Sequence, residues 1–183
     1  MFRVEKILQQ EMSSKYPQVN KVVSYGCMLG GKRLRPALLL LAAKATGEIT
    51  DNHFRLAAVV EMIHTATLVH DDILDEADTR RHLETVNSRW NNETSVLLGD
   101  FLFTHAFYLA STMPTTYAAM TIGLATNIVC EGELRQIASK QAFETSEEEY
   151  LGIIEAKTAE LCACSCQQAG RFMRKRCGCP TRQ

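Results

Sequence analysis

Proline and glycine are scarce in this chain. Of its 183 residues only 4 are proline and 10 are glycine, which permits long uninterrupted helices and disfavours a turn-rich β sandwich. Long apolar runs are missing too, since the longest covers residues 37–43, between Arg35 and Lys44, whereas a membrane-spanning helix needs about 20 apolar residues. The sequence therefore predicts a helical protein without a transmembrane segment.

A strong net charge and an export signal are also absent. The chain has 20 basic and 21 acidic residues and a net charge of -1, so its overall charge does not favour nucleic acid as a partner. Its first residues, MFRVEKI, carry early charges and lack the apolar stretch of a secretory signal. Seven cysteines without such a signal suit a reducing compartment. We expect a cytoplasmic protein that binds no nucleic acid.

The spacing of a zinc site is missing. Cys162, Cys164 and Cys166 lie two residues apart, and neighbours at that spacing point about 200° apart on a helix. A structural zinc site would use C-x-x-C pairs or nearby histidines, but no histidine follows His105. We interpret these cysteines as small residues packed within a helix.

Apolar residues instead recur at helical spacing along most of the chain. Residues 34–45 are rich in leucine and alanine and stop near Gly47. The next helix, capped by Asp51 or Asn52, keeps its apolar residues three and four apart through Ile73. Others are predicted within residues 1–25 and for about 95–111, 115–139 and 147–170, the last opened by a Ser146–Glu149 capping box. No strand pattern stands out, so the predicted fold class is all-α.

The strongest chemical signal lies near the end of the long second helix, where residues 70–75 read HDDILD. Asp71 and Asp75 are four residues apart and therefore lie one turn apart on the same face. Paired carboxylates suit Mg²⁺, which typically takes one or two of them together with phosphate oxygens of a substrate. A solvated acidic helix end is the simpler alternative.

Basic residues accompany this acidic motif. His64 lies two turns before Asp71 on nearly the same face, and Arg80 and Arg81 follow the motif. A second basic cluster, residues 30–36 (GGKRLRP), opens a helix, where free N–H groups favour an anion and glycines allow close approach of a ligand. Two basic groups and one carboxylate pair suit two diphosphates, one held through metal and one by cations alone.

These motifs, followed in order by residues 99–102 (GDFL), 131–133 (EGE) and 157–159 (KTA), resemble the trans-isoprenyl diphosphate synthases, or polyprenyl synthetases. The resemblance covers roughly residues 20–170. It implies an isoprenoid-synthase-type helical bundle around a central cavity. It also implies head-to-tail condensation of an allylic diphosphate with isopentenyl diphosphate, Mg²⁺ as cofactor, and a homodimer.

The resemblance also implies roles for individual residues. Asp71 and Asp75 would hold Mg²⁺ on the allylic diphosphate, and Arg80, Lys157 and Thr158 would contact that same group; these five are the expected catalytic residues. Isopentenyl diphosphate would be bound by Lys32, Arg35, His64 and Arg81.

Product length is expected to depend on the residues just before the aspartate motif. In the family they form the floor of the product cavity, and bulky aromatic residues there stop growth early. This chain has Ile63, Ala66 and Thr67 at those positions, which favours a long-chain, octaprenyl-type product. The alternative is that Ala66 simply packs in a tight helix crossing.

Two features depart from the family pattern. No aspartate follows Asp100, so the family's second aspartate-rich motif is missing. Residues 171–183 hold five basic residues and no acid, which leaves a net charge of -6 on residues 1–170. We predict that residues 1–170 are the N-terminal part of a polyprenyl synthetase domain, truncated or frameshifted so that the bundle is incomplete on its C-terminal side, and that 171–183 is an atypical basic tail. We expect the polypeptide to be impaired on its own.

Three alternatives account for part of the pattern. The first is a non-catalytic partner subunit of a heteromeric prenyl synthase, although such a subunit need not keep Asp71 and Asp75. A class I terpene cyclase also uses an aspartate-rich motif, but it has no second diphosphate for residues 30–36 to hold. A helical scaffold with a charged rim would bind no diphosphate at all.

Overall fold

Helices make up nearly all of the described structure, a computed structural model in which residues 1–139 and 145–171 are described. The predicted basic tail, residues 171–183, lies outside the described residues except for the backbone of residue 171. Within the described residues the one strand pair is a short antiparallel hairpin of β1 (Thr79–Arg80) and β2 (Leu83–Glu84). The all-α prediction is confirmed. The helices are α1 (Phe2–Glu11), α2 (Pro17–Met28), α3 (Leu34–Thr46), α4 (Asp51–Leu74), α5 (Val86–Arg89), α6 (Asn92–Ser111), α7 (Tyr117–Ser139), α8 (Glu147–Ile154) and α9 (Glu160–Arg171), with a π-helical segment at Glu155–Ala159 between the last two.

Three details differ from the sequence-based prediction. The first 25 residues hold the whole of α1 and most of α2, because Pro17 occupies the first turn of a new helix. The N-cap of α4 is Thr50, so the prediction of Asp51 or Asn52 was wrong; the Thr50 amide donates to His53 Nδ1 at 2.9 Å. The hairpin was not predicted, since two-residue strands leave no alternating pattern.

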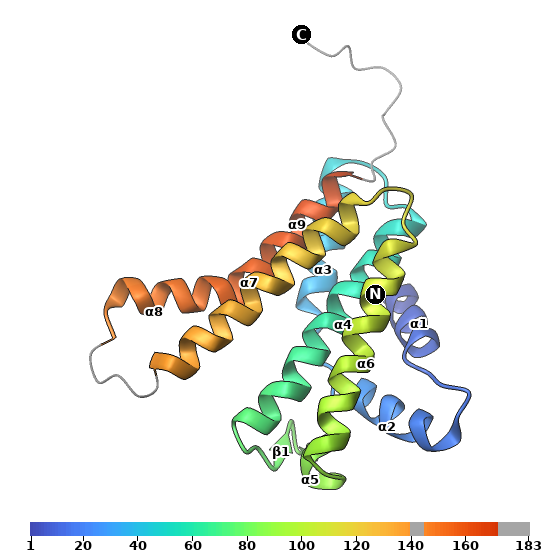
Figure 1. The fold of residues 1–183 in the computed structure, drawn as a ribbon. Helices are drawn as coiled ribbons and strands as arrows, with labels where there is room; N and C mark the ends of the chain where they lie inside the picture. Colours follow the sequence, from blue (N-terminus) through green and yellow to red (C-terminus); the bar gives the residue numbers. More distant parts are fainter. Residues whose placement is uncertain (140–144, 172–183) are drawn as a thin grey trace, which may run out of the picture.

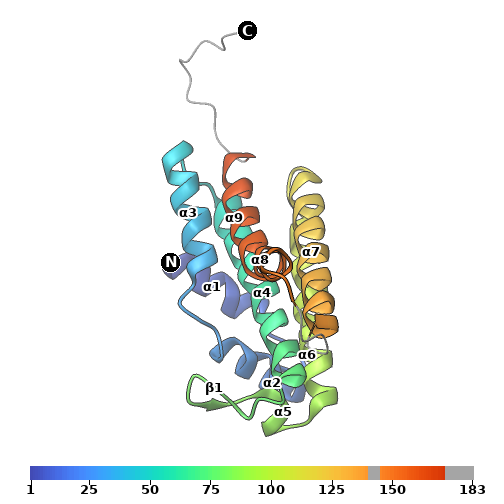
Figure 2. The ribbon, with the colours of Figure 1, turned by 90° about the vertical axis from the view of Figure 1, so that its left-hand side faces the viewer.

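Helix α4 forms the centre of the bundle. It packs against α1, α3, α6 and α9, and Figures 1 and 2 both place it between α3 and α6. Every side chain from Leu56 to Ile63 is buried, as expected for a helix covered on all sides. Because each such Leu, Ile or Val contributes about 1.5–3 kcal/mol on burial, packing holds α4 in place and with it the polar residues at its C-terminal end.

After α6 the chain forms an antiparallel helix pair. Helices α7 and α9 lie side by side, and α8 with the end of α7 reaches beyond the rest of the bundle (Figure 1). Large apolar side chains on this arm are exposed, among them Leu134 and Leu151. In the part of the chain that is described, no helix combines the length and apolar character needed to cross a membrane.

Candidate functional site

Two carboxylates of the aspartate motif lie one turn apart at the C-terminal end of α4. The Asp75 amide donates to the Asp71 carbonyl at 2.8 Å and closes the last turn. The Asp71 side chain is largely buried, and burial together with the nearby Glu133 raises the pKa of its carboxyl, although Lys157 opposes this. Such a carboxylate gains from a cation placed beside it.

Lys157 brings a positive charge to Asp71 from the π-helical segment. Its Nζ donates to Glu133 Oε2 at 2.8 Å and to Gln136 Oε1 at 3.0 Å, and lies 3.8 Å from Asp71 Oδ2. Burial lowers the pKa of Lys157, but the hydrogen bond with Glu133 and the charges of Asp71, Glu133 and Asp75 together outweigh it, so the pKa is raised and the ammonium stays charged. The π-helical turn thus faces the aspartate motif, and such turns are frequent at functional sites.

Close approach between α7 and the π-helical segment explains part of the EGE motif. A Cβ atom at Gly132 would lie 2.8 Å from the Ala156 Cβ, which places Glu133 beside Lys157. Thr158 is exposed and lines, with Lys157 and Gln136, a cleft of about 400 Å³ between α7 and α8. The structure therefore brings Lys157 to Asp71 and leaves Thr158 on the adjoining cleft wall.

Asp72 is a functional candidate that sequence reasoning missed. It is 2% exposed, and its Oδ1 accepts from Arg80 Nε at 2.9 Å and lies 2.7 Å from Arg80 Nη2. Asp72 points into the bundle, because α4 turns each residue about 100° from the last. It fixes Arg80 beside the aspartate motif. In the sequence, the only signal for Asp72 was its position next to Asp71.

A cationic cleft lies at the N-terminal end of α3. Its lining includes all four residues predicted to act together on one anion, namely Lys32, Arg35, His64 and Arg81, and its volume is about 240 Å³. Among the described residues no ion pair engages Lys32 or Arg35, and the buried Arg35 Nε has no hydrogen-bond partner. Cations that converge without ion-pair partners can hold an anion.

The pKa of His64 agrees with a strongly cationic cleft. Burial, and then the charges of Arg35, Arg81 and other arginines, lower the pKa of His64 to about 4. The imidazole is therefore neutral at pH 7, and an anion in the cleft would offset the part of this pKa shift that comes from the arginines.

The two glycines that precede Lys32 make room for arginine side chains. A Cβ atom at Gly30 would lie 2.1 Å from Arg33 Nη1, and one at Gly31 would lie 2.5 Å from Arg81 Nη2. Arg81 Nη1 also donates to the Leu29 carbonyl at 3.0 Å. The sequence suggested that the glycines admit a ligand; in the structure two guanidinium groups fill that space.

Comparison with known proteins agrees with these motifs. The sequence model of the family described as Polyprenyl synthetase matches residues 16–176. The chain belongs to this family. Octaprenyl diphosphate synthase of Escherichia coli K12 is 36% identical over 170 residues, which are 93% of this chain and 53% of that protein. The all-trans-nonaprenyl-diphosphate synthase (geranyl-diphosphate specific) of Rhodobacter capsulatus is 42% identical over 159 residues, 86% of this chain and 49% of that protein.

Solved structures of similar polyprenyl synthetases share the fold. A decaprenyl diphosphate synthase from Rhodobacter capsulatus superposes with a TM-score of 0.88 at 39% identity, over 93% of this chain and 53% of its own. A polyprenyl synthase from Caulobacter crescentus, complexed with calcium and isoprenyl diphosphate, gives a TM-score of 0.87 at 36% identity, over 91% and 51%. The chain spans about half the length of the relatives it matches.

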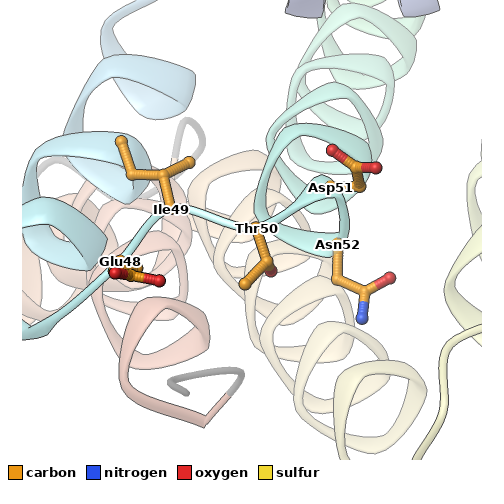
Figure 3. Close-up of a pocket in the computed structure, with 5 residues that line it drawn as sticks. All are labelled: Glu48, Ile49, Thr50, Asp51 and Asn52. Carbon is orange, nitrogen blue, oxygen red and sulfur yellow. The ribbon is translucent and has the colours of Figure 1, made fainter. Parts of the chain in front are cut away.

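Not every pocket on this chain belongs to the candidate site. A pocket of about 360 Å³ lies at the loop between α3 and α4 (Figure 3). Its Asp51 pairs with Arg3 at 2.6 Å, and Asp51 and Asn52 point to opposite sides in Figure 3. The pocket also lies at the other end of α4, about 30 Å from Asp71. It takes no part in the site.

Proposed function

We propose that this chain binds the two diphosphate substrates of a trans-prenyltransferase, which condenses an allylic diphosphate with isopentenyl diphosphate. The observation that carries the proposal is the convergence of Lys32, Arg35, His64 and Arg81 on one cleft, where among the described residues no ion pair engages Lys32 or Arg35. Asp71 follows His64 by two turns of the same helix, about 10 Å along its axis. Two diphosphates can therefore lie next to each other.

Isopentenyl diphosphate occupies the cationic cleft in this proposal. Lys32 and Arg35 supply charges that no acid in the described ranges neutralises, and Arg81 is already held in place by the Leu29 carbonyl. Binding here requires no metal, because cations alone balance the diphosphate.

The allylic diphosphate lies at Asp71 and Asp75 and is bound through Mg²⁺. No group of three or more His, Cys, Asp or Glu in residues 1–139 and 145–171 could hold a metal by itself. This fits Mg²⁺, which uses one or two carboxylates and completes its shell with phosphate oxygens and water. When bound, the ion neutralises charge on the diphosphate, and the residues that would hold it are Asp71 and Asp75.

Arg80 and Lys157 act on the leaving group. As the allylic C–O bond breaks, negative charge develops on the diphosphate, and fixed cations stabilise that charge without reorganising. Asp72 fixes Arg80, and Glu133 fixes Lys157. The isopentenyl double bond then attacks the allylic cation to form the new C–C bond, and the proton lost passes to the departing diphosphate. Thr158 lies at the edge of this region.

Three finer properties are part of the proposal. A long-chain product is supported by the octaprenyl and nonaprenyl relatives and by the small, fully buried Ala66 before the motif. A homodimer is supported by exposed apolar side chains on α6, such as Leu97 and Tyr108. A cytoplasmic location stays a prediction from the sequence.

Turnover by the 183-residue polypeptide alone should be weak. No aspartate follows Asp100 in these 183 residues, so in this proposal they supply only Asp71 and Asp75 as carboxylates for Mg²⁺ on the allylic diphosphate. Incubation with labelled isopentenyl diphosphate, an allylic primer and Mg²⁺ tests this. Elongation at about 1 s⁻¹, an ordinary enzymatic rate, would refute it. A companion chain that carries such a motif should restore turnover.

Substrate binding is the direct test of the proposed function. Calorimetry should detect isopentenyl diphosphate with or without Mg²⁺, and Arg35→Met should abolish that binding. Binding of an allylic diphosphate should require Mg²⁺ and should be lost in Asp71→Asn with Asp75→Asn. Glu48→Gln, at the unrelated pocket of Figure 3, is the control and should bind both ligands normally. The proposal fails if the wild-type chain binds neither diphosphate.

A further inference from the structure

Arg33 lies in the middle of the basic segment, yet its donors are already occupied. Its Nε donates to Glu5 Oε1 at 2.7 Å and its Nη2 to Glu5 Oε2 at 3.2 Å, while Nη1 donates to Glu61 Oε1 at 2.8 Å. Its side chain is 14% exposed, and that of Glu61 is 2% exposed. Burial would lower the pKa of Arg33, but these two carboxylates raise it above its ordinary value, so the charge is permanent.

The backbone at Arg33 adopts an uncommon conformation. Its φ and ψ are 55° and 37°, in the left-handed region that side-chain-bearing residues avoid. Such strain persists only where surrounding contacts fix it, and it clusters at functional sites. Here the strained residue is the N-cap of α3, between Lys32 and Arg35. The direction of both side chains therefore depends on this backbone turn.

The guanidinium connects three parts of the bundle. Glu5 comes from α1 and Glu61 from the buried centre of α4, while Gly30 leaves space for the guanidinium within the basic segment itself. Glu61 also lines the cationic cleft. The negative charge of Glu61 would repel a bound anion if Arg33 did not neutralise that charge.

We propose that Arg33 is a positioning residue for the cationic cleft. Anchored by Glu5 and Glu61, it holds residues 30–35 in the turn that directs Lys32 and Arg35 toward the ligand, and it does not itself contact the ligand. The identity of that ligand, isopentenyl diphosphate, rests on the proposed function; the role of the anchor does not.

Helix α1 provides a matched pair of variants for the test. Glu5→Gln weakens the anchor of Arg33. Glu11→Gln removes one carboxylate from the same helix, but its partner is His105 Nε2 on α6, at 2.9 Å. The two carboxylates are similarly exposed, at 38% for Glu5 and 31% for Glu11. A general loss of α1 packing would affect both variants alike.

Two measurements separate the anchor from the ligand. Hydrogen–deuterium exchange of the peptide covering residues 29–36, in the ligand-free chain, reports the order of the turn. Calorimetry reports the Kd for isopentenyl diphosphate. In Glu5→Gln we expect faster exchange in this peptide and a Kd raised about 10-fold, the effect of one charged hydrogen bond. Glu11→Gln should change neither, and Arg33→Lys should restore part of the binding that Arg33→Met loses.

The outcomes are distinct. Unchanged exchange at residues 29–36 in Glu5→Gln overturns the proposal, and so do equal effects of Glu5→Gln and Glu11→Gln. A raised Kd in Arg33→Met with exchange unchanged in every variant would mean that Arg33 binds the ligand directly, and this also overturns it. Faster exchange in Glu5→Gln and Arg33→Met only, with no binding by the wild-type chain, supports the anchor and refutes the proposed function instead.

Discussion

Gly99, in the GDFL motif, offers a sharp test of how the aspartate helix is held against α6. A Cβ atom at this position would lie 2.1 Å from His70 Nε2 and 2.4 Å from its Cδ2. The His70 ring could move only by giving up contacts, because Nε2 bonds the Val96 carbonyl at 3.2 Å and the ring packs 5.9 Å from that of Phe103. His70 directly precedes Asp71, so displacement of its ring disturbs the motif.

The sign of Gly99→Ala should depend on His70. Alanine gains about 1 kcal/mol over glycine inside a helix, whereas overpacking a filled site costs about 1–3 kcal/mol. In the wild-type background Gly99→Ala should therefore lower the free energy of unfolding by about 1 kcal/mol. In a His70→Ala background the clash is gone, and the same change should raise it by about 0.5–1 kcal/mol. The coupling between the two sites is then about 1–3 kcal/mol.

Urea unfolding followed by circular dichroism measures all four variants of this cycle. Gly123→Ala is the matched control, since a Cβ atom there would meet only Phe107 Cε1, at the ordinary contact distance of 3.8 Å. It should stabilise by about 0.5–1 kcal/mol in both backgrounds. If Gly99→Ala changes stability with the same sign in both backgrounds, the steric argument is refuted.

Three further predictions concern single side chains. Asp72→Ala should destabilise the fold by about 1–3 kcal/mol, because it leaves the partly exposed Arg80 without its buried hydrogen-bond partner. It should also weaken Mg²⁺-dependent binding of an allylic diphosphate; calorimetry and urea unfolding that match the wild type would contradict this. The pKa of His64 is lowered to about 4 from an ordinary 6.5, so between those values the unfolded chain binds a proton that the folded chain does not, and stability should fall as pH drops from 6.5 to 4. His64→Gln should flatten that part of the stability profile. Parallel profiles of His64→Gln and the wild type would count against burial of the neutral ring. Burial raises the pKa of the Cys164 thiol to about 11, so iodoacetamide at pH 8 should label the exposed Cys166 before Cys164. Mass spectrometry that finds Cys164 labelled as fast as Cys166 would disprove this prediction.

The helical fold was largely predictable because its signal is local. Apolar spacing located α3, α4, α6, α7 and the helix that follows Ser146, since each buries a stripe that recurs at the helical period. The cap of α4 was predicted wrongly because Thr50, Asp51 and Asn52 are all good caps, and only the reciprocal bond with His53 distinguishes them. The hairpin around Arg81 was missed because it depends on left-handed backbone at Arg81 and His82, which sequence pattern does not reveal.

The candidate site could be predicted by residue but not by arrangement. The motifs named Lys32, Arg35, His64 and Arg81, and the structure places all four on one cleft. Asp72 was missed because two adjacent aspartates look alike in sequence, whereas in the bundle Asp71 faces Lys157 and Asp72 faces Arg80. The role of the paired glycines was also misread, since the groups that fill their space come from Arg33 and Arg81.

Sequence by itself determined the fold class, the family and the chemistry that is available, because periodicity, spacing and residue type are properties of neighbours along the chain. Only the tertiary structure decided which charges are neutralised and which remain for a ligand. Arg33 and Arg35 are two residues apart and chemically identical, yet Glu5 and Glu61 occupy the first, whereas the Nε of the second has no partner in the described part of the chain. That difference arises because Glu5 and Glu61 lie 28 residues before and after Arg33, on helices that come together only in the folded bundle.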